Sequence, residues 1–126
     1  MKLEEQVVNR ELSQKIDELE IRGESLYAWY KYSFINVKSW WALVPNKGDS
    51  IKNISAYTVA ELGEILPNQI EDWSLETVKE GIRMFYVAYS GGNWGFDIMD
   101  NKCFRDKSEA NARAKALIWL KENGYL

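Results

Sequence analysis

The sequence of 126 residues contains no histidine, a single cysteine and only two prolines. Histidine is the commonest general base in enzymes and the commonest ligand of transition metals in proteins. Its absence excludes the histidine-dependent triads of serine and cysteine hydrolases and the zinc motifs of proteases and deaminases. The single cysteine, Cys103, excludes an internal disulfide and a zinc cluster. We therefore predict that the protein is not an enzyme and has no catalytic residues, cofactor or metal.

Long apolar runs and a broad basic surface are also missing. No stretch approaches the roughly 18 apolar residues that a membrane-spanning helix needs, so no membrane partner is expected. A lone cysteine is typical of a reducing compartment, and we expect the protein to be cytoplasmic. The net charge of −3 argues against a dedicated binder of duplex DNA. Residues 22–52 nevertheless carry a net charge of +3, which leaves a local basic patch open.

What the chain does contain is typical of one folded domain, which we place over residues 1–126. Hydrophobic residues make up 46% of it and charged residues 28%, a globular composition. Three segments show helical signals. Apolar residues recur every three or four positions from Leu3 to Leu19, and Gly23 is expected to close this first helix. Thr58 and Glu61 have the spacing of a capping box, in a short helix that Pro67 ends.

The third helix is predicted from Ser108 to Asn123, with Ser108 as its N-cap. Its apolar residues include Leu117 and Leu120, which we expect in the core. Arg113 lies within the same apolar arc, where it either extends along its methylene groups to solvent or pairs with a buried acid.

Two β-hairpins are predicted between these helices. The first has strands over residues 26–34 and 39–44, joined by the more polar residues 36–38. The second spans residues 83–99 and is expected to turn at Gly91-Gly92, which places Val87 opposite Phe96 in the core. Residues 68–80 are interpreted as an acidic connector. The predicted fold is α+β in the order α-ββ-α-ββ-α, with an antiparallel sheet of about four strands and helices mainly on one face.

Tryptophan is the compositional exception, with six in the chain. Consecutive residues in a strand point to opposite faces, so Trp40 and Trp41 cannot both be buried if helices cover only one face of the sheet. We expect at least one of Trp29, Trp40 and Trp41 to be exposed, and exposed aromatic side chains often mark binding surfaces. The candidate binding residues are those of the first hairpin that combine aromatic and positive groups: Trp29, Lys31, Lys38, Trp40 and Trp41.

Other motifs fit ordinary structure better than chemistry. The glycines at residues 91–95 lack the lysine and helix start of a phosphate-binding loop. Asp97 and Asp100 would point to different faces of a strand, which does not suit a pair of catalytic carboxylates. Cys103 has Lys102 and Arg105 nearby but no histidine to activate it, so we interpret it as an incidental thiol.

Three segments resemble a known group of proteins: VVNRELSQKIDELEIRGESLYAW at residues 7–29, AYTVAELGEILP at residues 56–67 and SEANARAKALIWLKENGYL at residues 108–126. In this order and spacing they are similar to small, uncharacterised proteins encoded by phages and prophages of gut bacteria. The resemblance implies a biological setting but no activity and no site residues.

From these features we predict a phage- or prophage-type accessory protein that acts by binding, with another protein as the expected partner. Weak binding of single-stranded nucleic acid through the aromatic and lysine-bearing hairpin, residues 25–44, is the alternative. Self-association is left open.

Overall fold

The computed structural model describes residues 2–46, 53–70, 73–80, 84–91 and 103–126, which contain four helices and seven strands. The helices are α1 (Leu3–Gln6), α2 (Arg10–Glu18), α3 (Val59–Ile65) and α4 (Glu109–Glu122). The strands are β1 (Tyr27–Phe34), β2 (Val37–Pro45), β3 (Ile54–Ala56), β4 (Gln69–Ile70), β5 (Trp73–Glu80), β6 (Met84–Gly91) and β7 (Cys103–Asp106).

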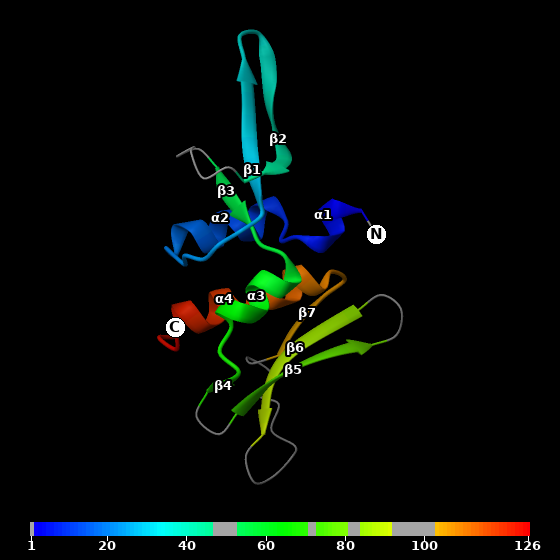
Figure 1. Cartoon of the computed structure of the whole chain (residues 1–126), viewed down its shortest axis with the longest axis vertical. Helices are drawn as coiled ribbons and strands as arrows, with labels where there is room; N and C mark the ends of the chain where they lie inside the picture. The colour runs from blue at the N-terminus through cyan, green and yellow to red at the C-terminus, as the bar shows by residue number, and fades with distance from the viewer. Residues whose placement is uncertain (1, 47–52, 71–72, 81–83, 92–102) are drawn as a thin grey trace.

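The strands form two antiparallel sheets, which confirms the predicted α+β class. One sheet has the order β2-β1-β3 and the other the order β4-β5-β6-β7. The expected sheet of about four strands corresponds to the second of these, and the first hairpin belongs to the other. Helices α2, α3 and α4 occupy the middle of the molecule between the two sheets (Figure 1). Helix α2 contacts β3, while α4 contacts β6 and β7.

Helix α4 is the centre of the core. It contacts the other three helices as well as the larger sheet. Because its neighbours lie on several sides, its buried residues are not confined to one stripe, although polar and charged residues alternate with them. Its buried residues are Ala110, Ala112, Ala114, Ala116, Leu117, Ile118 and Leu120. This confirms the predicted burial of Leu117 and Leu120.

The predicted starts of α3 and α4 are also confirmed. The Thr58 hydroxyl accepts a hydrogen bond from the Glu61 amide, and the Glu61 carboxylate accepts one from the Thr58 amide. Helix α3 ends just before Pro67, as expected. The Ser108 side chain accepts from the Asn111 amide at 3.2 Å and thereby caps α4.

The N-terminal segment forms two helices, so the prediction of one continuous helix closed by Gly23 was wrong. Between α1 and α2 the chain is extended: Val7 pairs with Thr58, and the Val8 amide donates to the carbonyl of Tyr57 at 2.9 Å. Asn9 then restarts the helix, because its side chain accepts from the Leu12 amide at 2.8 Å. The pairing with the segment before α3 is a tertiary interaction that overrides the local helical periodicity.

The predicted register of the second hairpin was also wrong. Gly92 and the expected partner strand, including Phe96, lie outside the described residues. Strand β6 is nevertheless paired at both edges, because Val87 lies opposite Thr77 of β5 and Phe104 of β7. No edge is left at Val87 for Phe96. Val87 itself is fully buried, as predicted.

The segment interpreted as an acidic connector contains β4 and β5. In β5 the partly buried Leu75 and Thr77 alternate with the exposed Glu76 and Val78. This alternation with a period of two residues is the signature of a strand that is covered on one face.

Candidate functional site

The β1–β2 hairpin, hereafter the arm, projects beyond the helices at one end of the molecule (Figure 1). Its two strands match the two predicted runs, but β2 begins at Val37, so the connection is shorter than the predicted residues 36–38. Strand β3 pairs with β1 only at residues 27–29, so the outer part of the arm is a two-stranded ribbon within the described chain. The turn is formed by Ile35 and Asn36, and Asn36 adopts a φ of 66°. Asparagine tolerates this left-handed conformation better than other residues with side chains.

One side of the arm carries a continuous row of apolar side chains, hereafter the aromatic face, formed by Tyr30, Tyr32, Phe34, Val37 and Trp40. The ring of Tyr32 stacks on Trp40 with centroids 5.3 Å apart, and Phe34 lies 5.6 Å from the same indole. Tyr30 meets Tyr32 edge to face at 4.8 Å. Such contacts fix the orientation of the rings along the ribbon.

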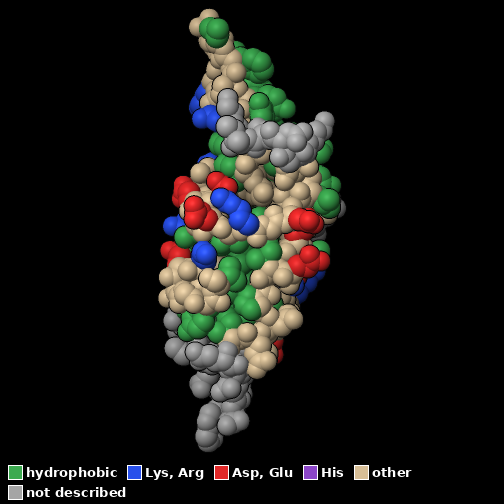
Figure 2. All heavy atoms as spheres, turned by 60° about the vertical axis from the view of Figure 1, so that its left-hand side comes forward, with side chains coloured by type: hydrophobic (Ala, Val, Ile, Leu, Met, Phe, Trp, Pro, Cys, Tyr) green, Lys and Arg blue, Asp and Glu red, His purple; other side chains and the backbone are tan. Residues whose placement is uncertain are grey.

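The outer part of this row and the neighbouring turn residue Ile35 are open to solvent. The exposed fraction is 60% for Phe34, 91% for Ile35, 55% for Val37 and 45% for Trp40. Figure 2 shows hydrophobic side chains following the arm to its tip. Contiguous exposed apolar residues of this kind mark interaction surfaces in folded proteins.

A β-bulge keeps the row continuous. The register shifts between Tyr32 and Phe34, so that Tyr32 lies opposite Trp40 but Phe34 lies opposite Val37. Two residues of β2 therefore face one residue of β1, which re-aims the side chains beyond the bulge. Directly opposed residues share a face, and Val37 is thus placed beside Phe34 on the aromatic face.

The opposite side of the arm is attached to the N-terminal segment. The indole N–H of Trp29 donates to the carbonyl of Val8 at 2.9 Å. The Arg10 guanidinium lies 5.2 Å from the centre of the Trp41 ring, and the Lys31 ammonium lies 5.9 Å from it. Trp29 and Trp41 are accordingly half-buried and anchor the arm.

The structure therefore leaves three of the five predicted binding residues exposed and half-buries the other two. Trp40 is exposed, which confirms that at least one of the three tryptophans is open to solvent. Trp40 and Trp41 point to opposite faces, as predicted, because they pair with the successive residues Tyr32 and Lys31. Lys31 and Lys38 are exposed. Trp29 and Trp41 are half-buried and hold the base of the arm, so they are not part of its exposed surface.

Sequence reasoning missed the tip of the arm. Phe34, Ile35 and Val37 are more exposed than any tryptophan of the arm. The sequence did contain a signal for this exposed tip. The turn includes the apolar Ile35, whereas residues that join two strands are normally polar.

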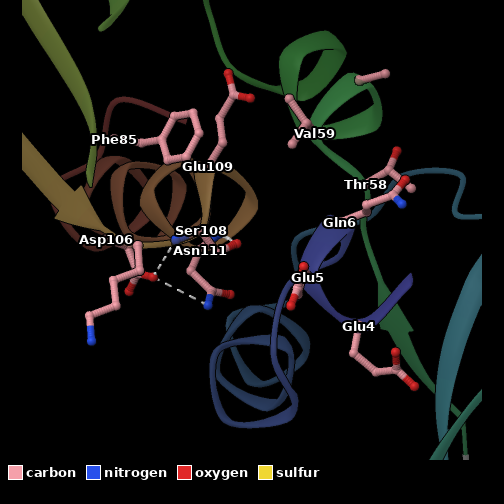
Figure 3. A pocket seen from close by; sticks show the side chains of 12 residues that line it. Glu4, Glu5, Gln6, Thr58, Val59, Phe85, Asp106, Ser108, Glu109 and Asn111 are labelled. Carbon is pink, nitrogen blue, oxygen red and sulfur yellow. Dashed lines mark hydrogen bonds between the residues drawn. The ribbon is translucent and has the colours of Figure 1, made fainter. Parts of the chain in front are cut away.

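A second feature is a cleft of about 700 Å³ on the body of the molecule. It lies between α1, the start of α3, Phe85 of β6 and the start of α4 (Figure 3). Its lining residues are Glu4, Glu5, Gln6, Thr58, Val59, Ala60, Phe85, Asp106, Lys107, Ser108, Glu109 and Asn111. They come from four segments that are distant in the sequence, so no local pattern could have revealed the cleft.

The cleft is acidic, with four carboxylates and one lysine in its lining. Asp106 is paired with Lys115, whose ammonium lies 3.0 Å away, and Glu109 is paired with Arg113 at 3.5 Å. Glu4 and Glu5 are exposed and form no ion pair with any residue that the structure describes. The uncompensated negative charge of the cleft therefore lies on α1.

Asp106 also organises the start of α4. Its carboxylate accepts a hydrogen bond from the Ser108 amide at 2.9 Å. Burial alone would raise the pKa of Asp106, but this bond and the Lys115 ammonium outweigh burial and lower that pKa. Asp106 is thus held as a carboxylate at the wall of the cleft.

Across the described part of the chain, no three acidic or cysteine side chains are grouped in a way that could hold a metal ion. Cys103 is half-buried in β7. Among the helices described, none has the length and apolar character needed to cross a bilayer. Comparisons of the chain with protein-family models, with curated proteins and with solved structures found no match.

Proposed function

We propose that this chain acts by binding another protein, and that the arm is its binding element. The observation that supports this proposal is the row of exposed apolar side chains from Trp40 to the tip of a projecting hairpin. Exposed aromatic side chains held rigidly by their neighbours provide contact area at a low entropic cost, and tryptophan is enriched among residues that dominate binding energy.

The arrangement of charge favours a protein over single-stranded nucleic acid. A nucleic-acid strand that stacks its bases on aromatic rings needs cations beside the same rings to meet its phosphates. Lys31 lies on the face opposite Trp40, since it pairs with Trp41. The arm therefore combines lysines and an aromatic row but separates Lys31 from the exposed rings. Nucleic-acid binding remains the second candidate, on the strength of the two exposed lysines.

The proposed setting is a phage or prophage carried by a bacterium, with the protein in the bacterial cytoplasm. Three segments resembling small phage proteins support the first part, and the single cysteine supports the second.

The test is the substitution Trp40→Ala, with Val78→Ala as its matched control. Val78 is an exposed apolar residue of β5, in the other sheet. Both proteins would be used to capture partners from infected or lysogenic cells, and the affinity for a captured protein would be measured by calorimetry. We expect Trp40→Ala to weaken binding about 30-fold or more, the loss typical of a dominant contact residue. Val78→Ala should leave the affinity unchanged.

The melting temperature separates binding from folding. Trp40 lies outside the core cluster, so its loss should change the melting temperature by no more than about 2 °C. Unchanged capture by Trp40→Ala would contradict the proposal. Binding of oligonucleotides that is abolished by Trp40→Ala and falls steeply with salt would favour nucleic acid instead.

A further inference from the structure

We propose that the arm of one copy occupies the acidic cleft of a second copy, and that the protein forms a reciprocal dimer. This inference rests on the proposed role of the arm as a protein-binding element and names its partner. It is drawn from three properties of the two surfaces: their charge, their apolar content and their dimensions.

The charges of the two surfaces are complementary. Between residues 25 and 46 the only charged side chains are Lys31 and Lys38, and both are exposed. The cleft carries four carboxylates against one lysine, Lys107, and Glu4 and Glu5 are unpaired among the described residues. Opposite charges on the two surfaces steer association and fix the orientation of the partners.

The apolar parts are also complementary. The tip of the arm exposes Phe34, Ile35 and Val37. The cleft contains the apolar side chains of Val59, Ala60 and Phe85 among its acids (Figure 3). Its volume of about 700 Å³ is sufficient for several side chains of the tip. Burying the tip there would remove from water the most exposed apolar residues of the arm.

The dimensions require two chains rather than one. The arm extends away from the helices that form the cleft, so it cannot fold back into the cleft of its own chain (Figure 1). Six positions separate Trp29, at the base, from Ile35, at the tip, and an extended strand covers about 20 Å over that length. That reach allows the tip to enter a neighbouring molecule while the base stays anchored.

Exchange of arms between two copies gives a closed, symmetric assembly. Each chain has one arm and one cleft, so two chains related by a two-fold axis can satisfy both. Docking would also support the arm itself, because an isolated two-stranded ribbon is only marginally stable in water.

The first experiment is charge reversal followed by sedimentation equilibrium of the full chain at low salt. The arm variant is Lys31→Glu with Lys38→Glu, and the cleft variant is Glu4→Lys with Glu5→Lys. We expect the wild type to be a dimer and each variant to dimerise at least tenfold more weakly. Combining all four substitutions should restore dimerisation to within about threefold of the wild type, because the charges again match.

Mixing supplies an internal control. The arm variant keeps an intact cleft and the cleft variant keeps an intact arm, so an equimolar mixture should form heterodimers through both contacts, one of them wild-type and the other with both charges reversed. A charge-matched control is Glu64→Lys with Glu122→Lys, two exposed acids that do not line the cleft. Unlike the cleft variant, this control should dimerise with an affinity close to that of the wild type.

The second experiment tests the position of the tip by cross-linking. In chains that carry Cys103→Ser, Ile35→Cys in one copy should form a disulfide with Ala60→Cys in the other. Val78→Cys, on a distant exposed strand, should give no cross-link with Ile35→Cys. A wild type that stays monomeric at about 100 μM, or a dimer that is indifferent to both charge reversals, would overturn the inference. A monomer that still captures a different protein through Trp40 would overturn it while leaving the proposed function intact.

Discussion

Tyr89 allows the packing of the core to be tested by a change of one oxygen atom. Its side chain is fully buried, and its hydroxyl donates a hydrogen bond to the carbonyl of Pro67 at 2.8 Å. Tyr89→Phe removes the donor and leaves that carbonyl without it. We expect the substitution to lower the free energy of unfolding near pH 8 by about 1–3 kcal/mol, the cost of an unsatisfied buried polar group.

The pH dependence of the difference gives a sharper test. Burial raises the pKa of Tyr89 to about 12, while the nearby Arg113 partly opposes the rise. An unfolded tyrosine has a pKa of about 10. Between these two values the unfolded chain has released the proton and the folded chain has not, so the stability of the wild type falls as the pH rises. Its contribution is complete below pH 10 and is lost toward pH 12.

The slope follows from linkage. When only the unfolded chain has released one proton, the free energy of unfolding falls by about 1.4 kcal/mol per pH unit. Tyr89→Phe has no ionisable hydroxyl at this position, so its free energy of unfolding lacks this contribution. The advantage of the wild type near pH 8 should therefore shrink by about that amount at pH 11. Other groups that titrate in this range are common to both proteins and cancel in the difference.

The assay is urea unfolding of both proteins at pH 8, 9.5, 10.5 and 11, followed by tryptophan fluorescence. All six tryptophans are retained in the variant. A difference in unfolding free energy that stays constant from pH 8 to pH 11 would refute the argument, because it would show that folding does not change the pKa of Tyr89.

Two further predictions concern the core and the wall of the cleft. Leu117→Ala and Leu120→Ala should each lower the free energy of unfolding by about 2–5 kcal/mol, since both residues are fully buried in the central helix; a near-neutral result for both in urea unfolding would contradict that placement. Because folding lowers the pKa of Asp106, its stabilising contribution is present above pH 4 and decreases as the pH falls through the folded value. The advantage of the wild type over Asp106→Asn should accordingly diminish in acid unfolding series below about pH 4, and an advantage that is the same at pH 3 and pH 7 would contradict the pKa shift.

The parts of the fold that the sequence predicted correctly depend on contacts between near neighbours. Thr58 and Glu61 are three residues apart, and their reciprocal hydrogen bonds form within one helical turn. Ser108 caps α4 in the same way. The arm was predictable for a related reason, since its two strands follow one another and need only a short turn.

The failures involve partners that are distant in the sequence. Gly91-Gly92 is a strong local turn signal, but it contains no information about the strands that already occupy both edges of β6. The break after α1 depends likewise on Thr58, about fifty residues away in the chain, which pairs with Val7.

For the candidate site, the alternation rule predicted the exposure of a tryptophan but not which one. The choice of Trp40 is determined by the N-terminal segment, because Arg10 covers the ring of Trp41 and Val8 accepts the hydrogen bond of Trp29. That segment lies about twenty residues earlier in the chain, and its approach to the arm is a property of the folded molecule.

The central position of α4 determines the order in which the protein can fold. Asn9, before α2, donates its amide proton to the side chain of Asn111, so the segment before α2 is in direct contact with the first turn of α4. Helix α4 also contacts strand β6 and helix α2. A nascent chain that has been synthesised only to residue 107 therefore cannot close its core, and its apolar faces remain available to chaperones and proteases. Contacts between such distant segments slow folding, so this vulnerable state lasts at least until α4 has been synthesised.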